Sequence, residues 1–396
     1  IVFTSNLFLM FNIRKINVCD IFVLIWGMYY LQDIIYPQGL INQILQLIMI
    51  ALGLFSFFQC ILNRSNPELI RSTILLILMY IVYGSIIIMF GDNIDKTVDS
   101  TYLKASFNSL LPILFFYQQA KKQHLNAIRI KVYFFFIAAI TIMHFMQVDK
   151  VAMLMLDIEE NTNNVAYMIL SLLPFAFLFN EKPLLQYIIL SILVFYILLG
   201  MKRGAILIGI IVVLLFIYSS IKEQSLGKKF LVILFSVILV GVLANYIGQM
   251  MNTNEYFANI IQNTLDGESS GRDKIFSSIW SAIKRDTNIL KLILGHGANS
   301  TINYAGNFAH NDWLETLCNN GVLGLSLLLY FFISFARTLF CSRRRLSEPL
   351  FYCFVSLFII SFLKTIFSMS IQSFDMCQGL LIGFLSYHAL SQNSRI

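Results

Sequence analysis

The sequence consists of long apolar blocks that are separated by short polar connections. Each block approaches the roughly 20 residues that a helix needs to cross a bilayer core of about 30 Å. Hydrophobic residues make up 58% of the chain and charged residues 12%. A soluble domain carries about 25% charged residues. The chain therefore lacks the solvated surface of a soluble enzyme, a disordered scaffold or a small disulfide-rich protein.

About twelve blocks are predicted to be transmembrane helices of an all-α polytopic integral membrane protein. They are residues 17–36, 41–62, 72–90, 102–118, 132–148, 165–179, 184–199, 205–220, 230–248, 322–340, 350–369 and 376–391. The absence of alternating ten-residue segments favours helices over an outer-membrane barrel. The first block is expected to be a membrane anchor rather than a cleaved leader. Pro112 and Pro174 can kink the helices that contain them.

The predicted helices divide the chain into three parts. Residues 1–248 are expected to hold helices 1–9, residues 249–321 a long outer loop, and residues 322–396 helices 10–12. The loop contains an amphipathic stretch at 275–283, so we expect it to be ordered. A long connection among short ones is usually functional or disordered, and this loop is therefore expected to carry the chemistry.

The net charge of +7 indicates the orientation of the helices rather than a nucleic-acid partner. With a cytoplasmic N-terminus, 17 of the 28 Lys and Arg residues lie on the cytoplasmic side, and five more lie in the long loop. Basic residues accumulate in cytoplasmic loops, whereas long loops escape this rule. Both termini are therefore predicted to be cytoplasmic and the long loop to be extracytoplasmic.

Two basic motifs are candidates for binding an anion on the outer side. The sequence MKRGA at 201–205 places Lys202 and Arg203 in a very short connection, and SGRDKIFSSIW at 270–280 places Arg272 in the long loop. An arginine fork pairs bidentately with phosphate oxygens, which lysine does less well. The alternatives are that the first two side chains extend to lipid headgroups and that Arg272 is an ordinary solvated residue.

A third polar feature leads into the tenth predicted helix. Its parts are LGHGAN at 294–299, FAHNDWLE at 308–315 and NGVLGL at 320–325. Asn311 and Asp312 are candidates to cap the helix that follows. A histidine such as His310, with a pKa near neutrality, can act as a general base or as a partner of phosphate. The alternative is an ordinary loop histidine.

Metal and nucleotide chemistry are poorly supported by the sequence. His296 and His310 with nearby carboxylates are a weak candidate metal set, because HExxH, DxD and tight His/Cys spacing are missing. GxGxxG, Walker A and Ser-His-Asp signatures are missing too. The six cysteines lack CxxC spacing, so we expect small buried apolar residues. We therefore predict neither a metal nor a cofactor.

Together these motifs resemble the hallmark regions of the O-antigen ligase/polymerase family of bacterial polysaccharide assembly. Residues 295–325 are similar to its His-Asn and Gly-hydrophobic-Leu-Gly region, MKRGA to its Ser-Arg-Gly element, and SGRDKIFSSIW to its Gly-Arg…Trp element. NNVA at 163–166 resembles an Asn-rich entry to another span. The order and predicted membrane sides match the family, although Lys202 stands where Ser is common.

The resemblance implies a membrane glycosyltransferase with a GT-C-like helical bundle in the bacterial inner (cytoplasmic) membrane. Its substrates would be glycans on undecaprenyl diphosphate, handled at the periplasmic or extracytoplasmic face without metal or cofactor. The implied catalytic residues are Arg203 and Arg272, which would bind the diphosphate, and His310, which would activate the acceptor hydroxyl. The implied substrate-binding residues are Lys202, Asn311, Asp312, Glu315, Trp280 and Trp313, with Tyr256 and Tyr304 as further faces for sugars.

Within the family we expect a polymerase of O-antigen or capsule, which moves a growing chain onto a new lipid-linked repeat unit. A chain-length regulator and a flippase are its expected partners, in addition to membrane lipid, and no nucleic acid is expected. The alternative is a ligase that transfers the glycan to lipid A-core. A lipid-linked oligosaccharide flippase also fits many spans, but its polar residues should lie at the bilayer midplane. A chain-length regulator itself would need fewer spans and a coiled-coil domain.

Overall fold

The computed structural model describes residues 16–35, 39–63, 65–90, 96–154, 164–223, 272–368 and 376–390, with six isolated positions between 241 and 262. All regular elements in these ranges are helices, so the predicted all-α class is confirmed. They are α2 (Val18–Ile35), α3 (Leu40–Leu62), α4 (Glu68–Phe90), α5 (Lys96–Lys121), α6 (Ala127–Leu154), α7 (Ala166–Leu170), the 3-10 helix η2 (Leu173–Phe179), α8 (Pro183–Leu199), α9 (Arg203–Glu223), α12 (Arg272–Arg285), α13 (Ile289–Leu294), α14 (Ser300–Ala305), α15 (Asp312–Ser342), α16 (Glu348–Phe367) and α17 (Met376–His388).

Six helices in the described ranges are long and apolar enough to cross a membrane. They are α3, Glu68–Ile86 of α4, Ala127–Val148 of α6, Arg203–Lys222 of α9, α15 and α16. Shorter apolar helices lie at Val18–Gln32, Ala166–Phe179 and Pro183–Leu199. The chain is therefore a multi-pass α-helical membrane protein, but the predicted number of twelve spans is not matched in this part of the chain.

The differences from the predicted spans have local causes. Residues 165–179 divide into α7 and η2, where Pro174 lies in the first turn of the 3-10 helix and has no N–H for a helical hydrogen bond. The helix predicted at 376–391 is α17, whose 13 residues are too few for a bilayer core. Residues 230–248 lie almost entirely outside the described ranges. The fourth predicted span lies within α5, which begins with polar turns and continues through Pro112.

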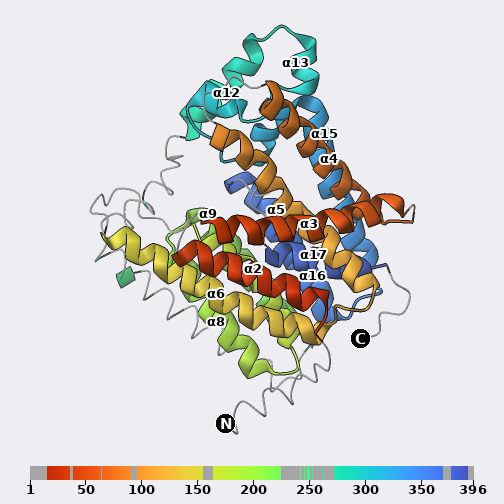
Figure 1. Cartoon of the computed structure of the whole chain (residues 1–396). Coiled ribbons are helices and arrows are strands. Elements are labelled where there is room, and N and C mark those ends of the chain that lie inside the picture. The colour runs from red at the N-terminus through yellow and green to blue at the C-terminus, as the bar shows by residue number, and fades with distance from the viewer. Residues whose placement is uncertain are drawn as a thin grey trace.

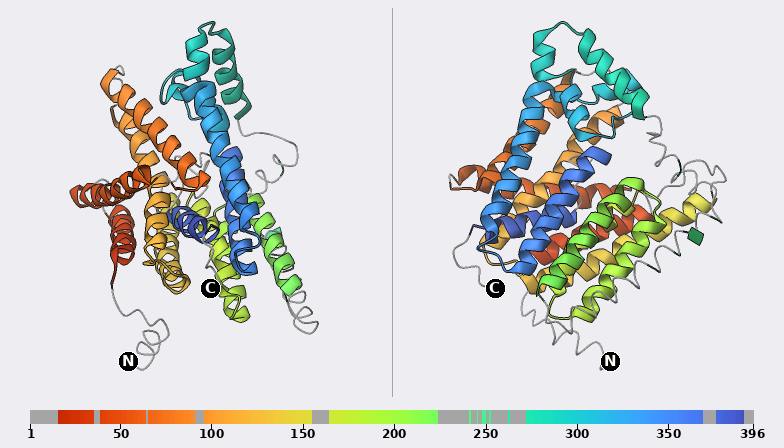
Figure 2. Two further views of the ribbon diagram at one scale, coloured as in Figure 1. Left: turned by 90° about the vertical axis from the view of Figure 1, so that its right-hand side faces the viewer. Right: turned by 180° about the vertical axis from the view of Figure 1, so that it is seen from behind.

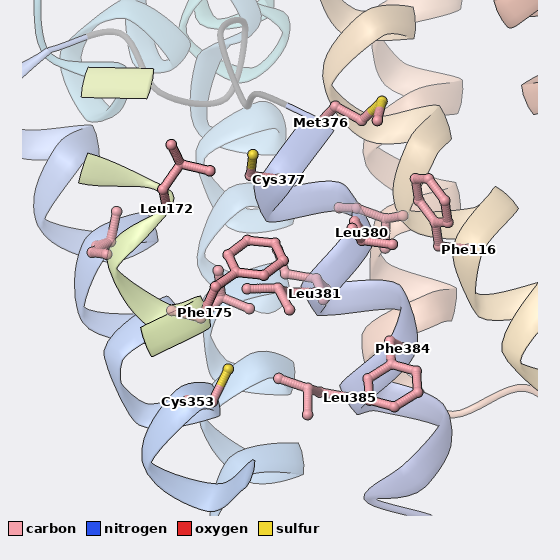
Figure 3. Close-up of a cluster of buried hydrophobic side chains, with 14 of the residues drawn as sticks. Phe116, Leu172, Phe175, Cys353, Met376, Cys377, Leu380, Leu381, Phe384 and Leu385 are labelled. Carbon is pink, nitrogen blue, oxygen red and sulfur yellow. The ribbon is translucent and has the colours of Figure 1, made fainter. Parts of the chain in front are cut away.

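The helix α17 is deeply buried, since every residue from Met376 to Ser386 is buried. It packs against α5 and α16, and its apolar side chains meet Phe116 of α5 and Phe175 of η2 (Figure 3). The helix α16 in turn contacts α9, α15 and α17, as the views in Figure 2 show. The helix α16 is therefore surrounded by helices from distant parts of the sequence.

Ion pairs connect several helices at the ends that were predicted to be cytoplasmic. Lys222 of α9 pairs with Glu348 of α16 at 3.0 Å, and Arg337 of α15 pairs with Glu68 of α4 at 2.7 Å. Each pair joins residues that were predicted on the same side of the membrane. The cytoplasmic location of that side stays a prediction.

The described part of the predicted long loop, from Arg272 onward, is ordered as helices, and Figure 1 shows α12 and α13 next to the ends of α4 and α15. The helix α15 begins at Asp312, ten residues before the predicted start of a span at residue 322. Gly321 interrupts it with φ 64° and ψ −163°, so α15 consists of two helices joined at a kink. The motif residues 312–320 form the first of them.

Candidate functional site

The C-terminal end of α16 collects side chains from two of the predicted motifs. Arg272 donates from Nη1 to the carbonyl oxygen of Phe367 at 3.0 Å, and Asn311 donates from Nδ2 to the carbonyl oxygen of Ile366 at 3.3 Å. The last carbonyls of a helix have no partner within it and carry partial negative charge. A guanidinium and an amide are therefore natural partners for this helix end.

The first residues of α9 reach the same place from a third part of the chain. Arg203 begins α9, and the next residue, Gly204, lies against Tyr167 and Phe367. A Cβ atom at Gly204 would lie closer than 3.0 Å to the Tyr167 hydroxyl and to the Phe367 Cβ atom. This close approach brings Arg203 to the helix end that accepts the hydrogen bond of Arg272.

His310 lies within the electrostatic reach of both basic motifs. Its backbone is left-handed, with φ 51°, and its side chain is half-buried. Burial is the main cause that lowers its pKa below the ordinary value, and the positive charges of Arg272 and Lys202 lower it further. The imidazole is thus held neutral at physiological pH, which is the form that can accept a proton.

Left-handed backbone accompanies two of these motifs. Met201, directly before the Lys-Arg pair, has φ 49°, and His310 has φ 51°. Residues without glycine's freedom adopt such angles at a cost of about 1–3 kcal/mol, and they persist where the surrounding contacts fix them. The backbone at Met201 and at His310 is therefore fixed by packing rather than by local preference.

Glu315 connects the loop before His310 to α14 and α15. Its carboxylate accepts hydrogen bonds from the Thr301 hydroxyl at 2.5 Å, the Ala309 backbone N–H at 2.7 Å and the Asn319 amide at 2.8 Å. The residue is 3% exposed. This arrangement fixes the backbone next to His310, so the structure favours a positioning role for Glu315.

Asn311 and Asp312 lie at the start of α15, as their spacing predicted. Asn311 is the N-cap residue, since its Oδ1 atom accepts the Leu314 N–H at 3.0 Å. This part of the prediction is confirmed. Asp312 is the first helical residue and is 3% exposed. Their assignment as substrate-binding residues, like that of Glu315, stays a prediction.

The two tryptophans predicted to bind substrate, Trp280 and Trp313, have different surroundings. Trp313 packs against Phe332 and Phe362 and donates its indole N–H to the Thr365 hydroxyl at 2.9 Å. Trp280 is 46% exposed on α12, with the Lys284 ammonium 5.6 Å from its ring centroid. The open ring of Trp280 fits the predicted sugar-stacking role better than the enclosed ring of Trp313, although the assignments of both stay predictions.

The remaining aromatic candidates and the cysteines are placed as follows. The Tyr304 hydroxyl is 2.9 Å from Nδ1 of His296, and Tyr256 lies outside the described residues. All six cysteines are free, and five of them are buried, as expected, whereas Cys341 is exposed. In the described part of the chain, no group of three or more His, Cys, Asp and Glu residues gathers in a way that could hold a metal ion.

The sequence reasoning missed Lys364, a cation in the last turn of α16. Its side chain is 2% exposed, and its ammonium is 5.7 Å from the ring centroid of Tyr167, whose hydroxyl faces Gly204. An ionisable residue within a membrane span is usually functional. The single lysine in the apolar block 350–369 was therefore a signal in the sequence.

Three segments that are far apart in the sequence thus meet at the C-terminal end of α16. They are the start of α9, the start of α12 and the start of α15, and each contains one of the motifs described above. Residues 188–329 match the family model of O-antigen ligases. The match confirms the resemblance to the O-antigen ligase/polymerase family. The matched region extends from within α8 into α15 and includes Arg203, Arg272 and His310. A comparison with curated proteins finds no match.

Proposed function

We propose that the protein is a polysaccharide polymerase that transfers an undecaprenyl-diphosphate-linked glycan onto the non-reducing end of another lipid-linked repeat unit. The family supports a membrane glycosyltransferase of the O-antigen ligase/polymerase type. The observation that carries the proposal is that the start of α9 at Arg203, the Arg272 side chain, and Asn311 next to His310 meet at the C-terminal end of α16.

In the proposed reaction the acceptor hydroxyl oxygen forms a bond to the anomeric carbon of the donor sugar. The bond from that carbon to the diphosphate oxygen breaks, and undecaprenyl diphosphate leaves with the electron pair. His310, kept neutral by burial and by its cationic neighbours, takes the hydroxyl proton. Arg203 and Arg272 stabilise the charge that develops on the phosphate oxygens. Attack opposite the leaving group inverts the anomeric centre, and NMR analysis of donor and product linkages would show retention if this is wrong.

Single substitutions test the site assignment. Loss of one preorganised donor to developing negative charge costs about 10²–10³ in rate, and loss of a positioned base about 10²–10⁴. Arg203→Ala, Arg272→Ala and His310→Ala should therefore abolish detectable polymer while the protein still reaches the membrane. Arg285→Ala, at the exposed end of α12, is the matched control and should leave polymer normal. Normal polymer from all three site variants would overturn the assignment.

The alternative within the family is a ligase that transfers the glycan to lipid A-core, and lipid analysis of a deletion strain separates the two. Loss of a polymerase should leave single repeat units on the core. Loss of a ligase should leave bare core and polymer stranded on undecaprenyl diphosphate. The GT-C-like bundle, the inner membrane and the outward-facing site belong to the same proposal, as do a chain-length regulator and a flippase as partners.

A further inference from the structure

The short helix α13 presents an apolar surface that the described part of the chain does not cover. Five of its six residues are apolar, and none is buried. These five are between 45% and 70% exposed, and they are Ile289, Leu290, Leu292, Ile293 and Leu294. We call this set the α13 face. Large exposed apolar patches mark contacts with a partner or a membrane.

The end of α13 is fixed against the kink of α15. A Cβ atom on Gly321 would lie closer than 3.0 Å to the backbone of Ile293 and Gly295, and a Cβ atom on Gly295 would lie equally close to the backbone of Asn319. Two further backbone hydrogen bonds follow, from His296 N–H to the Cys318 carbonyl at 2.8 Å and from Gly297 N–H to the Asn319 carbonyl at 3.1 Å. The position of the α13 face along the axis of α15 is therefore fixed.

Contacts with α4 and α15 show where the C-terminal end of α13 lies along these two helices. The Tyr83 hydroxyl of α4 donates to the carbonyl oxygen of Leu294. Tyr83 precedes the last residue of α4, Phe90, by seven residues, which is about 10 Å at 1.5 Å per residue. On α15 the contact falls at Gly321, where the apolar part of the helix begins. The C-terminal end of α13 therefore lies about two helical turns inside the apolar stretch of α4.

The spans that α13 touches also expose apolar side chains near the α13 face. On α4, Ile86 is 51% and Met89 72% exposed, and on α15, Val322 and Leu323 are each 45% exposed. Glu68 and Arg337 form their ion pair at the opposite ends of these two helices. Apolar side chains are thus exposed on α13 and on the nearby turns of two candidate membrane spans.

We propose that α13 is inserted in the bilayer leaflet on the side away from the Glu68–Arg337 pair, with its apolar face covered by lipid chains. An amphipathic helix at an interface buries its apolar side by about 5–10 Å, which agrees with the depth given by Tyr83. The polar side of the helix faces the headgroup region, and on this side Lys291 pairs with Asp286 at 2.8 Å. The inserted helix anchors the outer segment to the membrane next to the candidate site. This proposal does not depend on the reaction that the protein catalyses.

Spin-label accessibility in proteoliposomes of phosphatidylcholine and phosphatidylglycerol tests the insertion. Labels are placed by Leu290→Cys or Ile289→Cys in a Cys341→Ser background, because Cys341 is the exposed native thiol. Leu329→Cys, 48% exposed on α15, is the lipid control, and Ser281→Cys on exposed α12 is the aqueous control.

Labels on the α13 face should collide with oxygen more than with the water-soluble nickel reagent, as is expected for the label at residue 329. The ratio of oxygen to nickel accessibility should be at least several-fold higher than at residue 281. A high nickel accessibility at both α13 positions would place this face in water and overturn the proposal. Low accessibility to both reagents would mean that protein covers the face, which also overturns it. The two independent label positions keep the test decisive if one variant folds poorly.

Discussion

At the scale of single residues, the chemistry of the site depends on keeping His310 neutral. The causes that lower its pKa are burial first and then the charges of Arg272 and Lys202. A base with a lowered pKa keeps its unprotonated form at more acidic pH than a free imidazole, whose pKa is about 6.5. The rate should therefore be constant near neutrality and fall only as the pH drops through the lowered pKa.

Lys202→Met tests this electrostatic coupling. Removing one of the charges that lower the pKa of His310 should raise that pKa, so the acidic limb of the rate profile should move toward pH 6.5. The measurement is the initial rate of polymer formation against pH for the variant and the unmodified protein. Lys274→Met, on the exposed face of α12, is the control for loss of a positive charge. An acidic limb that stays in place for Lys202→Met would contradict the prediction.

Glu315 illustrates why the sequence could indicate a residue's importance but not its role. The motif FAHNDWLE placed it among substrate-binding candidates, because an acidic residue near a histidine is compatible with either role. The role depends on Thr301, Ala309 and Asn319, which surround the carboxylate only after α14 and α15 have packed. Such convergence arises from tertiary structure and leaves no spacing pattern in the sequence.

Glu315→Gln is expected to destabilise the protein and to slow catalysis together. Three donors meet this carboxylate, and an amide that offers one acceptor oxygen leaves at least one buried donor without a partner, at a cost of about 1–3 kcal/mol. The measurements are thermal unfolding in detergent and the turnover of the folded fraction. Glu348→Gln, a solvent-exposed carboxylate in an ion pair, should change neither appreciably. An unchanged unfolding temperature for Glu315→Gln would refute this account.

At the scale of elements, the approach of α9 to α16 requires glycine at residue 204. A Cβ atom there would lie closer than 3.0 Å to the Tyr167 hydroxyl and to Phe367. Tyr167 is 8% exposed, so its ring has little room to move away. The sequence could show Gly204 beside Arg203, but its contact residue Phe367 lies more than 150 residues later, and local reasoning could not identify it.

Gly204→Ala should lower the rate at least tenfold, because it moves the start of α9, and therefore Arg203, away from Phe367. Adding Tyr167→Phe removes the nearer clashing atom and should restore part of the activity. Gly209→Ala, in the same helix, is the matched control: the nearest atom to its Cβ would be 3.7 Å away, and alanine favours a helix interior. Equal rates for Gly204→Ala and Gly209→Ala would exclude the proposed close packing.

Predicting the elements from hydropathy succeeded for the long uniform blocks and failed where burial replaced lipid contact. The blocks that became α3, α9 and α16 were found nearly at their observed bounds. The block that became α17 looks equally apolar, but its residues are buried among other helices and not against lipid. Hydropathy cannot separate these two apolar environments, and this is one reason why the twelve predicted spans exceed the six found among the described residues.

At the scale of the whole molecule, the orientation predicted from basic residues places the candidate site and Cys341 on opposite sides of the membrane. The part of α15 after the kink at Gly321, residues 322–342, reaches about 32 Å at 1.5 Å per residue. That length exceeds a bilayer core of about 30 Å. Cys341 lies at the far end from His310, two residues before the basic run Arg343–Arg345 that was predicted to be cytoplasmic.

A membrane-impermeant maleimide can therefore determine the orientation with a thiol that the chain already has. Five of the six cysteines are buried, so labelling of the native protein reports mainly on Cys341. In intact spheroplasts the native protein should remain unlabelled, and it should react after the membrane is permeabilised. Ser281→Cys, on the exposed face of α12, should be labelled without permeabilisation. Labelling of Cys341 in sealed spheroplasts would reverse the predicted topology and would move the candidate site to the cytoplasmic face, where an outward-facing transferase could not work.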